Sequence, residues 1–313
     1  MLAIVNKLLN YIDPRKYIRF FKKVLSKINL IQEALGRIEA RQINDLDLGI
    51  SDSEFRVFSQ WGEDGIIQYL VNKIEIKNKV FVEFGIENYL QSNTRFLLIN
   101  NNWSGLVIDG NKSDIDYLKQ DQIYWAHNIK AENAFISKKN IESILTDSGI
   151  DPDIGMLSID IDGNDYWIWD SIESFYPRIV ICEYNSIFGP FAKVTTCYRD
   201  DFTRYSEHHS GVLYGASISA LDDLAKGKGY SLVAGNTAGN NIFFVRNDLL
   251  SSNLSILSPQ EAYQKANFRE YKDKNGKLTF DNFEERLRNI QNEKVFDIGL
   301  QKNLKVKEVI KIP

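Results

Sequence analysis

From residue 51 onward, short apolar runs alternate with longer segments of helical periodicity, and this alternation limits the fold more than any other feature of the sequence. Strands buried on both faces give nearly continuous apolar runs, and parallel strands need helical crossovers between them. The pattern therefore predicts an α/β fold with helices on both faces of a parallel five-stranded sheet. The expected strands are 80–84, 105–109, 123–126, 155–161 and 178–183, and the expected helices are 64–75, 92–101, 112–120, 137–148 and 165–173.

The segment after residue 214 predicts how this sheet ends. "GASISALDDLAKGKGYSLV" is typical of a helix that stops near Gly227–Gly229 and is followed by a strand. "AGNTAGNN" then forms a cluster of turn residues, and "IFFV" is a second strand candidate. Two strands joined so tightly must be antiparallel. The predicted architecture is thus the Rossmann-like sheet of five parallel strands closed by an antiparallel hairpin, with N-terminal helices and a C-terminal extension.

The chain divides by pattern into three parts, with boundaries near residues 50 and 250. Residues 1–45 show apolar positions at three- and four-residue steps, and Pro14 is expected to begin a second helix with Asp13 as its cap. This segment holds nine Lys/Arg and four Asp/Glu, so it carries +5 while the remainder carries −9. We expect residues 1–50 to form a docking helix that pairs two copies of the chain. The alternative is a basic amphipathic helix on an anionic membrane.

Residues 51–250 form the predicted cofactor-binding domain, and residues 251–313 form the extension. In the extension, Ser258-Pro-Gln-Glu261 matches a helix capping box, "YKDKNGKLTF" predicts a hairpin, and "DNFEERLRNI" predicts a short helix. None of these patterns carries chemistry.

Composition sets broad limits on the class of protein. The 313 residues carry a net charge of −4, which argues against a general nucleic-acid binder. No apolar run approaches the roughly 18 residues of a membrane span, and the first residues do not resemble a signal peptide. The two cysteines, Cys182 and Cys197, do not suggest a disulfide framework. We therefore expect a cytoplasmic protein.

Polar side chains stand at the carboxyl end of every predicted parallel strand, where open α/β sheets bind their ligands. A single Asp-Gly after a strand is usually only a turn, but an acid inside an apolar run, such as Glu83 or Glu183, needs a partner once buried. Five such strand ends in register indicate a ligand site. The residues are Glu83 and Gly85, Asp109, Glu132 and Asn133, Asp160 and Asp162, and Glu183 and Asn185.

The loop after the first strand separates two classes of cofactor. A dinucleotide pyrophosphate requires a glycine-rich loop, whereas here Gly85 is followed by Ile86 and Glu87. S-adenosylmethionine has no phosphate and carries a sulfonium and an ammonium, which an acidic loop attracts. The position of Asp109 suits the two hydroxyls of a ribose, and Glu132 and Asn133 are placed to meet a purine.

The region from about 55 to 248 resembles the class I S-adenosylmethionine-dependent methyltransferases, specifically FkbM-like enzymes of bacterial polysaccharide loci. The stretches that carry the resemblance include "FSQWGEDGII", "VFVEFGIENYLQSNTRFLL", "WSGLVIDGN", "LSIDIDGNDYWIW", "PRIVICEYN" and "GYSLVAGNTAGNNIFFVRND". The resemblance implies an O-methyltransferase acting on a sugar hydroxyl of a nucleotide-sugar, capsule or O-antigen glycan. It also implies that Asp160 and Asp162 lie next to the transferred methyl, although Asp162 replaces the family's glutamate and the glycine-rich loop is reduced to Gly85.

Two segments leave alternatives open for cofactor binding. In "SQWGEDG", Gln60, Glu63 and Asp64 either fold over the charged end of the cofactor or form a helix start capped by Ser59. Asn93 and Thr94 either cap the next helix or touch the methionine moiety. The predicted cofactor-binding set is Gln60, Glu83, Gly85, Asn93, Thr94, Asp109, Glu132, Asn133 and Asp160.

Methyl transfer to a hydroxyl also needs a group that takes the proton. The candidates are His208 or His209, in the segment "RYSEHHSG", or a divalent metal, Mg²⁺ or Mn²⁺, bound by Asp162, Glu183 and Asn185 with or without Asp160. Without a metal, these oxygens would hydrogen-bond the sugar directly.

Rival classes remain open at this point. Asp160-Ile161-Asp162 matches the short Asp-x-Asp motif of metal-dependent glycosyltransferases, and a methyltransferase-like binding protein without activity is also compatible with the sequence.

Overall fold

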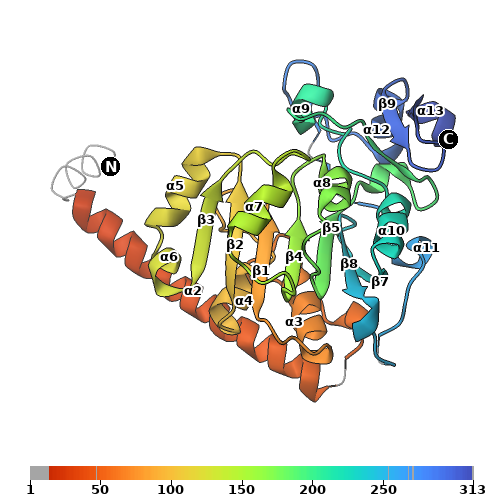
Figure 1. The fold of residues 1–313 in the computed structure, drawn as a ribbon. Coiled ribbons are helices and arrows are strands. Elements are labelled where there is room, and N and C mark those ends of the chain that lie inside the picture. Colours follow the sequence, from red (N-terminus) through yellow and green to blue (C-terminus); the bar gives the residue numbers. More distant parts are fainter. Residues whose placement is uncertain (1–13, 47, 253, 267, 270, 312–313) are drawn as a thin grey trace, which may run out of the picture.

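Seven strands form the central sheet of the computed structural model, which describes residues 14–46, 48–252, 254–266, 268–269 and 271–311. The strand order is β3-β2-β1-β4-β5-β8-β7 (Figure 1). Strands β1 to β5 pair in parallel, and β8 is antiparallel to both β5 and β7. The predicted sheet of five parallel strands and a closing hairpin is therefore confirmed. The strands are β1 (Val80–Phe84), β2 (Ser104–Asp109), β3 (Ile129–Asn133), β4 (Met156–Ile159), β5 (Ile179–Glu183), β7 (Tyr230–Gly235) and β8 (Asn241–Arg246).

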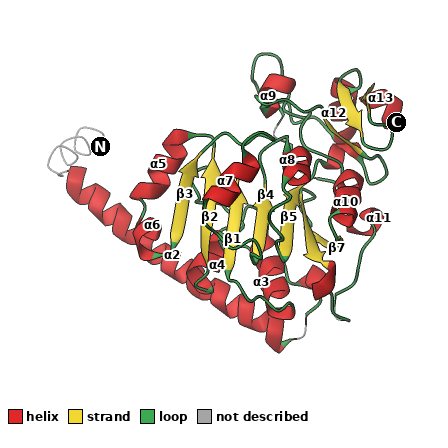
Figure 2. Ribbon diagram, viewed as in Figure 1, coloured by secondary structure: helices red, strands yellow, loops and turns green. Residues whose placement is uncertain are grey.

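Helices cover both faces of this sheet because the apolar side chains of each strand alternate between them (Figure 2). In β1, Phe81 packs with the cluster on one face, and Val82 and Phe84 pack with the cluster on the other. The first face is covered by α3 (Glu63–Lys73), α4 (Arg95–Asn100) and α5 (Lys112–Gln120), and the second by α7 (Ile141–Asp147), α8 (Asp165–Ser171) and α10 (Ile218–Gly227).

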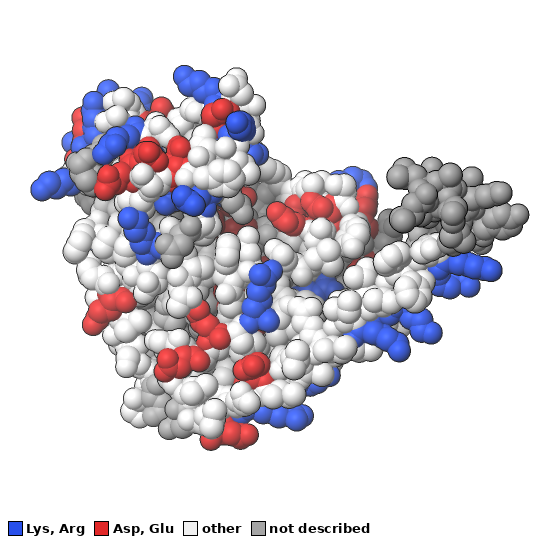
Figure 3. Space-filling view, turned by 180° about the vertical axis from the view of Figure 1, so that it is seen from behind, with Lys and Arg blue, Asp and Glu red and all other residues white. Residues whose placement is uncertain are grey.

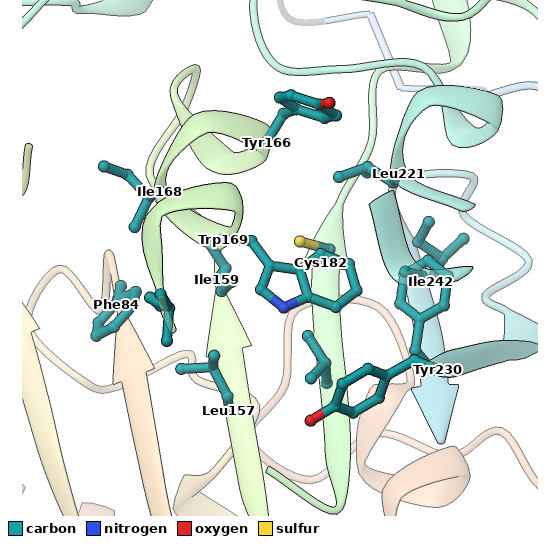
Figure 4. Packing of buried hydrophobic residues seen from close by; sticks show 14 of the residues in the cluster. Phe84, Leu157, Ile159, Tyr166, Ile168, Trp169, Cys182, Leu221, Tyr230 and Ile242 are labelled. Atoms are coloured by element: carbon teal, nitrogen blue, oxygen red, sulfur yellow. The ribbon is translucent and has the colours of Figure 1, made fainter. Parts of the chain in front are cut away.

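The second face is built around Trp169, which lies close to Cys182 and Tyr230 in Figure 4. The rings of Trp169 and Tyr230 are 5.9 Å apart at their centroids. Cys182 is fully buried, and both cysteines are free thiols. Burial of aromatic side chains of this size is the main force that holds α8 on the sheet.

The predicted strand at 123–126 is wrong. Those residues lie in α6 (Gln122–Ala126), whose first turn is capped by Asp121, since its Oδ1 accepts the Ile123 amide proton at 2.9 Å. Only Ile123 of this apolar run is buried. The true third strand begins three residues later at Ile129, because a short apolar run does not by itself distinguish a strand from a helical turn.

The N-terminal helix α2 (Pro14–Asp45) runs along the outside of the domain. Pro14 is its first residue, as predicted, whereas Asp13 and the first helix expected before it lie outside the described residues. The C-terminal half of α2 packs against α3 and α4 through Gly36, Ala40 and Ile43.

The C-terminal extension packs next to the carboxyl end of the large sheet. Its capping box at Ser258 and Glu261 and its turn around Gly276 are confirmed, the latter by the Lys272–Leu278 bridge. A small antiparallel sheet, which the sequence did not predict, joins this extension to the segment after β5. It contains β6 (Val194–Thr196), β9 (Lys294–Asp297) and β10 (Lys302–Lys305), and the remaining helices are α9 (Arg204–Glu207), α11 (Pro259–Ala262), α12 (Phe283–Ile290) and α13 (Val306–Val309).

Three short 3₁₀ turns complete the element order. They are Ile50–Asp52, Ser186–Phe188 and Asn247–Leu249.

Candidate active site

A cavity of about 680 Å³ opens beyond the carboxyl ends of β1, β2, β4 and β5, where the topology predicts a ligand site. Seven of its lining residues are acidic and one, Arg204, is basic. The acids are Glu83, Glu87, Asp109, Asp114, Asp160, Asp162 and Glu183. A cavity with this charge attracts cations and repels phosphate groups.

Glu83, at the end of β1, uses its carboxylate to hold the start of α4. Its Oε1 accepts the Asn93 amide proton at 2.9 Å, and its Oε2 accepts the hydroxyl of Ser92 at 2.5 Å and the amide proton of Thr94 at 3.2 Å. The Thr94 hydroxyl donates to the same oxygen. Burial raises the pKa of Glu83, and these hydrogen bonds oppose the shift. Glu83 therefore shapes the wall of the cavity. Thr94 does not line the cavity, but its amide and hydroxyl hold the Glu83 carboxylate in place.

Gly85 brings the first loop against the end of β4. Its φ is +71°, and a Cβ at this position would lie 1.5 Å from the carbonyl oxygen of Asp160. Only glycine avoids both the strained backbone and the clash. The glycine is thus explained by contact between two strand ends rather than by close approach to a phosphate.

Asp109 ends β2 with both carboxylate oxygens directed at backbone donors. Its Oδ2 accepts from the Glu87 amide at 2.8 Å, and its Oδ1 accepts from the Asn111 amide at 2.7 Å. Partial burial raises its pKa. Each oxygen keeps lone-pair capacity for a further hydrogen bond. The carboxylate is therefore held rigidly and can still bind a pair of hydroxyls.

The ends of β4, β5 and β8 carry a second set of polar groups with different properties. Among the described residues, the buried Oε2 of Glu183 finds no hydrogen-bond partner, and the same is true of the buried side-chain oxygens of Asn164 and Asn241. All three residues line the cavity, and their exposed fractions are 7%, 3% and 3%. Glu183 and Asn241 are direct neighbours in the β5–β8 register. Buried acceptors of this kind require a donor, so the site is complementary to a ligand rich in hydroxyl or ammonium groups.

Electrostatics at this end of the cavity favour protonation of the carboxylates. Burial raises the pKa of Glu183 well above its ordinary value, and the charges of Asp160 and Asp162 add to the effect. Asp160 shifts in the same direction for the same reasons. Asp165 accepts the amide protons of Ile161 and Gly163, and burial raises its pKa to about 6. Groups with such shifts are typical of proton-transfer sites.

Arg204, from α9, is the only cation in the lining. Its Nη1 lies 3.2 Å from Asp162 Oδ1, its Nε donates to the carbonyl of Gly211 at 2.5 Å, and its guanidinium stacks on the ring of Tyr214 at 4.1 Å. Burial opposes its charge, but Tyr214, Glu183 and Asp162 together raise its pKa. Arg204 therefore compensates part of the negative charge, mainly through exposed Asp162.

The cavity gathers eight of the predicted site residues and leaves six outside its lining. Those inside are Gln60, Glu83, Gly85, Asn93, Asp109, Asp160, Asp162 and Glu183. Those outside are Thr94, Glu132, Asn133, Asn185, His208 and His209. The exposed Asn133 donates to the Asp109 carbonyl at 2.9 Å, and Phe135 and Ile136 line the cavity in place of Glu132 and Asn133.

The predicted metal set is not assembled. The amide nitrogen of Asn185 donates to the carbonyls of Val212 and Tyr214, and its oxygen accepts from the Ile187 amide at 3.1 Å. Asn185 therefore caps a 3₁₀ turn, and its side-chain oxygen is not available to bind a metal ion together with Asp162 and Glu183. Within the described part of the chain, no group of three or more His, Cys, Asp or Glu is arranged to hold a metal ion.

The two histidines lie together outside the cavity lining. The Nδ1 of His208 is 2.6 Å from the Ser210 hydroxyl, and the rings of His208 and His209 are 4.2 Å apart. Burial lowers the pKa of His208, and the neighbouring His209 adds to that shift. Neither imidazole lines the cavity at the acidic strand ends.

In "SQWGEDG", both acids lie in the first turn of α3, as the helix-start interpretation predicts, but the N-cap is Gly62 and not Ser59. Asp64 Oδ2 accepts from Ser59 and from three backbone amides, and burial raises the Asp64 pKa to about 6. Glu63 Oε1 accepts from the amide groups of Asn236 and Asn241 at 2.7 and 2.9 Å. Of the three candidates, Gln60 alone reaches the cavity.

The lining residues that sequence reasoning missed include Phe135, Asn164, Arg204 and Asn241. Asn241 could have been found, because the predicted hairpin places the residue after its turn next to the end of the fifth parallel strand. Arg204 and Asn164 are positioned by tertiary contacts that leave no local pattern.

Neither a protein-family model nor a curated protein matches this sequence. Among solved structures, a putative caffeoyl-CoA O-methyltransferase from Staphylococcus aureus aligns with 13% identity over 72% of this chain and 99% of its own, at a TM-score of 0.41. The N-terminal domain of EvdMO1, solved with SAH, aligns with 11% identity over 67% and 95%, also at 0.41.

The CurJ carbon methyltransferase aligns with 9% identity over 59% of this chain at a TM-score of 0.38, and the match spans about half, 52%, of that protein. TM-scores this low do not carry a functional conclusion. The function of this protein is therefore inferred from the strand order and from the residues that line the cavity.

Proposed function

We propose that the protein is an S-adenosylmethionine-dependent O-methyltransferase whose acceptor is a hydroxyl of a sugar. The observation that carries the proposal is the cavity lining, with seven acids against one base and with unpartnered buried oxygens at one end. This lining suits a cofactor with a sulfonium and an ammonium, and an acceptor that donates several hydrogen bonds. It opposes a pyrophosphate inside the cavity.

The residues on the β1 and β2 side fit the cofactor. Asp109 would bind the ribose hydroxyls, Phe135 and Ile136 would contact the base, and the loop fixed by Glu83 would line the methionine end. The acidic character of this side supplies the electrostatic attraction for the cationic groups. When bound, S-adenosylmethionine supplies the methyl group that is transferred to the acceptor.

Glu183 is the residue best placed to take the proton. Transfer of a methyl group to a hydroxyl requires that the hydroxyl proton leave, and a side chain at the acceptor would have to receive it. Glu183 lines the cavity at the end of β5, and its carboxylate would accept that hydrogen bond and then the proton. A raised pKa makes it a better base than an ordinary carboxylate. Asn241 and Asn164 would orient neighbouring hydroxyls.

The acceptor is a sugar or a glycan of the capsule or O-antigen kind in this proposal. A nucleotide-sugar is compatible only if its diphosphate remains at the rim, because the interior is anionic. Glycosyltransferases with an Asp-x-Asp motif use a metal ion to hold the diphosphate of their substrate. The acidic interior repels a diphosphate, and no group of side chains in the described residues is arranged to hold a metal ion, so the site fits this alternative less well.

Ligand-induced stabilisation tests the cofactor. We expect S-adenosylhomocysteine to raise the melting temperature and UDP or GDP to have no effect, with or without Mn²⁺. Methyl transfer from labelled S-adenosylmethionine to a panel of sugars, nucleotide-sugars and glycans, with and without EDTA, then tests the reaction. Stabilisation by UDP and Mn²⁺ alone would favour the glycosyltransferase, and stabilisation by S-adenosylhomocysteine without any transfer would favour a binding protein.

A further inference from the structure

The first half of helix α2, residues 14–31, projects away from the domain as the red ribbon in Figure 1. The packing residues Gly36, Ala40 and Ile43 all lie in its second half. A Cβ on Gly36 would lie 2.5 Å from a methyl group of Val57, so this end is tightly docked. Among the described side chains of residues 15–31, by contrast, only Val24 is even half-buried. The projecting half is therefore a helix whose apolar residues are not covered by the part of the domain that the structure describes.

The exposed apolar side chains of this half follow a helical stripe. Apart from the adjacent pair Phe20 and Phe21, successive members are three or four residues apart, and at 100° per residue all of them fall within an arc of about 140°, so they share one broad face. Their exposed fractions lie between 41% and 61%, for Tyr17, Phe20, Phe21, Leu25, Ile28 and Ile31. A stripe of this length with three aromatic side chains is far more apolar than an ordinary solvated helix surface.

The opposite face of the same segment is cationic. Residues 14–31 contain six Lys/Arg and no Asp or Glu. Arg19 and Lys23 are exposed and fall on the side away from the stripe at 100° per residue, and the exposed Lys16 and Lys27 flank one edge of the stripe. Figure 3 shows Lys and Arg side chains along the lower edge of the projecting helix and uncharged side chains above them.

We infer that residues 14–31 form an interfacial helix that binds an anionic phospholipid surface. Charge decides between the two occupants that an apolar stripe could take. A second copy would bring another cationic segment alongside, and residues 14–31 hold no acid to pair with it. An anionic lipid surface offers negative charge along the whole helix, while the aromatic and aliphatic side chains enter the boundary between headgroups and acyl chains.

The helix would lie in the plane of the membrane rather than cross it. No helix in the described residues is long and apolar enough to span a bilayer. The inference rests on residues far from the cavity and does not depend on the proposed methyltransferase activity.

Vesicle flotation of the full chain tests the inference. We expect binding to vesicles of phosphatidylcholine with about 30% phosphatidylglycerol, at least tenfold weaker binding to phosphatidylcholine alone, and loss of binding as salt rises. The Phe20→Ser/Phe21→Ser variant should bind at least tenfold more weakly. Leu30→Ser is the matched control, because Leu30 is 58% exposed on the same segment but lies outside the apolar stripe.

Charge is tested in the same assay. Lys16→Glu/Lys23→Glu/Lys27→Glu should abolish binding, whereas Lys274→Glu/Lys302→Glu/Lys307→Glu, on exposed lysines of the C-terminal extension, should not change it. Light scattering of each variant distinguishes the rival occupant. The inference is overturned if the full chain does not bind anionic vesicles. It is also overturned if the parent protein is a dimer that binds no lipid and Phe20→Ser/Phe21→Ser converts it to a monomer. The latter result would establish pairing of two copies.

Discussion

The two sides of the cavity use carboxylates in opposite ways. On the β1 and β2 side, Glu83 and Asp109 accept two or more hydrogen bonds each from the loops around them. On the β4, β5 and β8 side, Glu183 keeps an unpartnered buried oxygen, and its pKa is raised by burial and by neighbouring acids. A saturated carboxylate holds a fixed shape for binding, whereas an unsaturated one is ready to receive a proton. The comparison assigns cofactor binding to the first side and chemistry to the second.

Removal of the Glu183 charge is the strongest way to break this comparison. Glu183→Gln keeps the shape of the side chain but leaves no base, so turnover should fall on the order of a hundredfold or more. The affinity for S-adenosylhomocysteine, measured by calorimetry, should be nearly unchanged. Glu207→Gln, on a partly buried carboxylate that pairs with Arg199 and is not among the residues that line the cavity, is the control and should retain normal turnover. Normal turnover in Glu183→Gln would mean that this side of the cavity does not supply the base.

The pH profile provides an independent check on Glu183. A base whose pKa is raised becomes protonated, and therefore inactive, at a higher pH than an ordinary carboxylate. The ordinary pKa of glutamate is about 4.3, and the acid limb of kcat/KM should lie at a higher pH than this value. The limb should be absent from the residual activity of Glu183→Gln. If the same limb persists in that variant, it belongs to another group.

Asp109 tests the binding side. Asp109→Ala should weaken cofactor affinity by about a hundredfold or more, because the two charge-assisted hydrogen bonds to the ribose hydroxyls contribute roughly 1.5–3 kcal/mol each. Calorimetry on a folded variant measures this, with turnover at saturating cofactor expected to change much less. Asp114→Ala is the matched control, since Asp114 also lines the cavity but lies on α5 beyond the strand end. Equal losses in both variants would show that only the total charge of the cavity matters.

Asp162 should have a smaller effect than the sequence motif suggests. Its side chain is 59% exposed and pairs with Arg204, and Asn185 is turned away from it. Asp162→Asn should therefore reduce turnover only a few fold, and EDTA should leave activity unchanged. A hundredfold loss that Mg²⁺ or Mn²⁺ restores after EDTA treatment would instead show that Asp162 holds a metal ion.

The sequence predicts the sheet well because its signals are local and repeated. Apolar runs of the right length, the acid or glycine at each strand end and the tight turn before "IFFV" together indicate most of the strands and the hairpin that closes the sheet. The failure at 123–126 concerns one short apolar run, where an Asp cap decided in favour of a helix. The small sheet formed by β6, β9 and β10 joins segments about a hundred residues apart, and no local pattern announces such a pairing.

The sequence predicted where along the chain the site residues lie, but not how their side chains are oriented or what they bind. The strand ends of Glu83, Asp109, Asp160 and Glu183 all reach the cavity, as the topology requires. Sequence could not tell that Glu83 would be saturated by the start of α4, or that Asn185 would turn into a 3₁₀ cap. Those outcomes depend on which backbone amides lie nearby, and that is fixed only by packing.

The smallest effect concerns stability and follows from the same raised pKa. Because the folded protein binds the Glu183 proton more tightly than the unfolded chain does, the free energy of unfolding falls as pH rises from the ordinary glutamate pKa to the folded one. Above that window, a buried carboxylate without full hydrogen bonding costs stability in the absence of ligand. Glu183→Gln should therefore melt at a higher temperature than the parent at pH 8, and the difference should shrink as pH falls toward about 4.3. Melting curves of both proteins across this range measure it, with Glu207→Gln expected to follow the parent at every pH. If the variant gains stability at pH 8 and loses turnover, then the cost of burying the Glu183 carboxylate at the end of β5 serves the reaction. If the variant is instead less stable than the parent at pH 8, then the Glu183 carboxylate has as many hydrogen bonds as the carboxylates on the cofactor side.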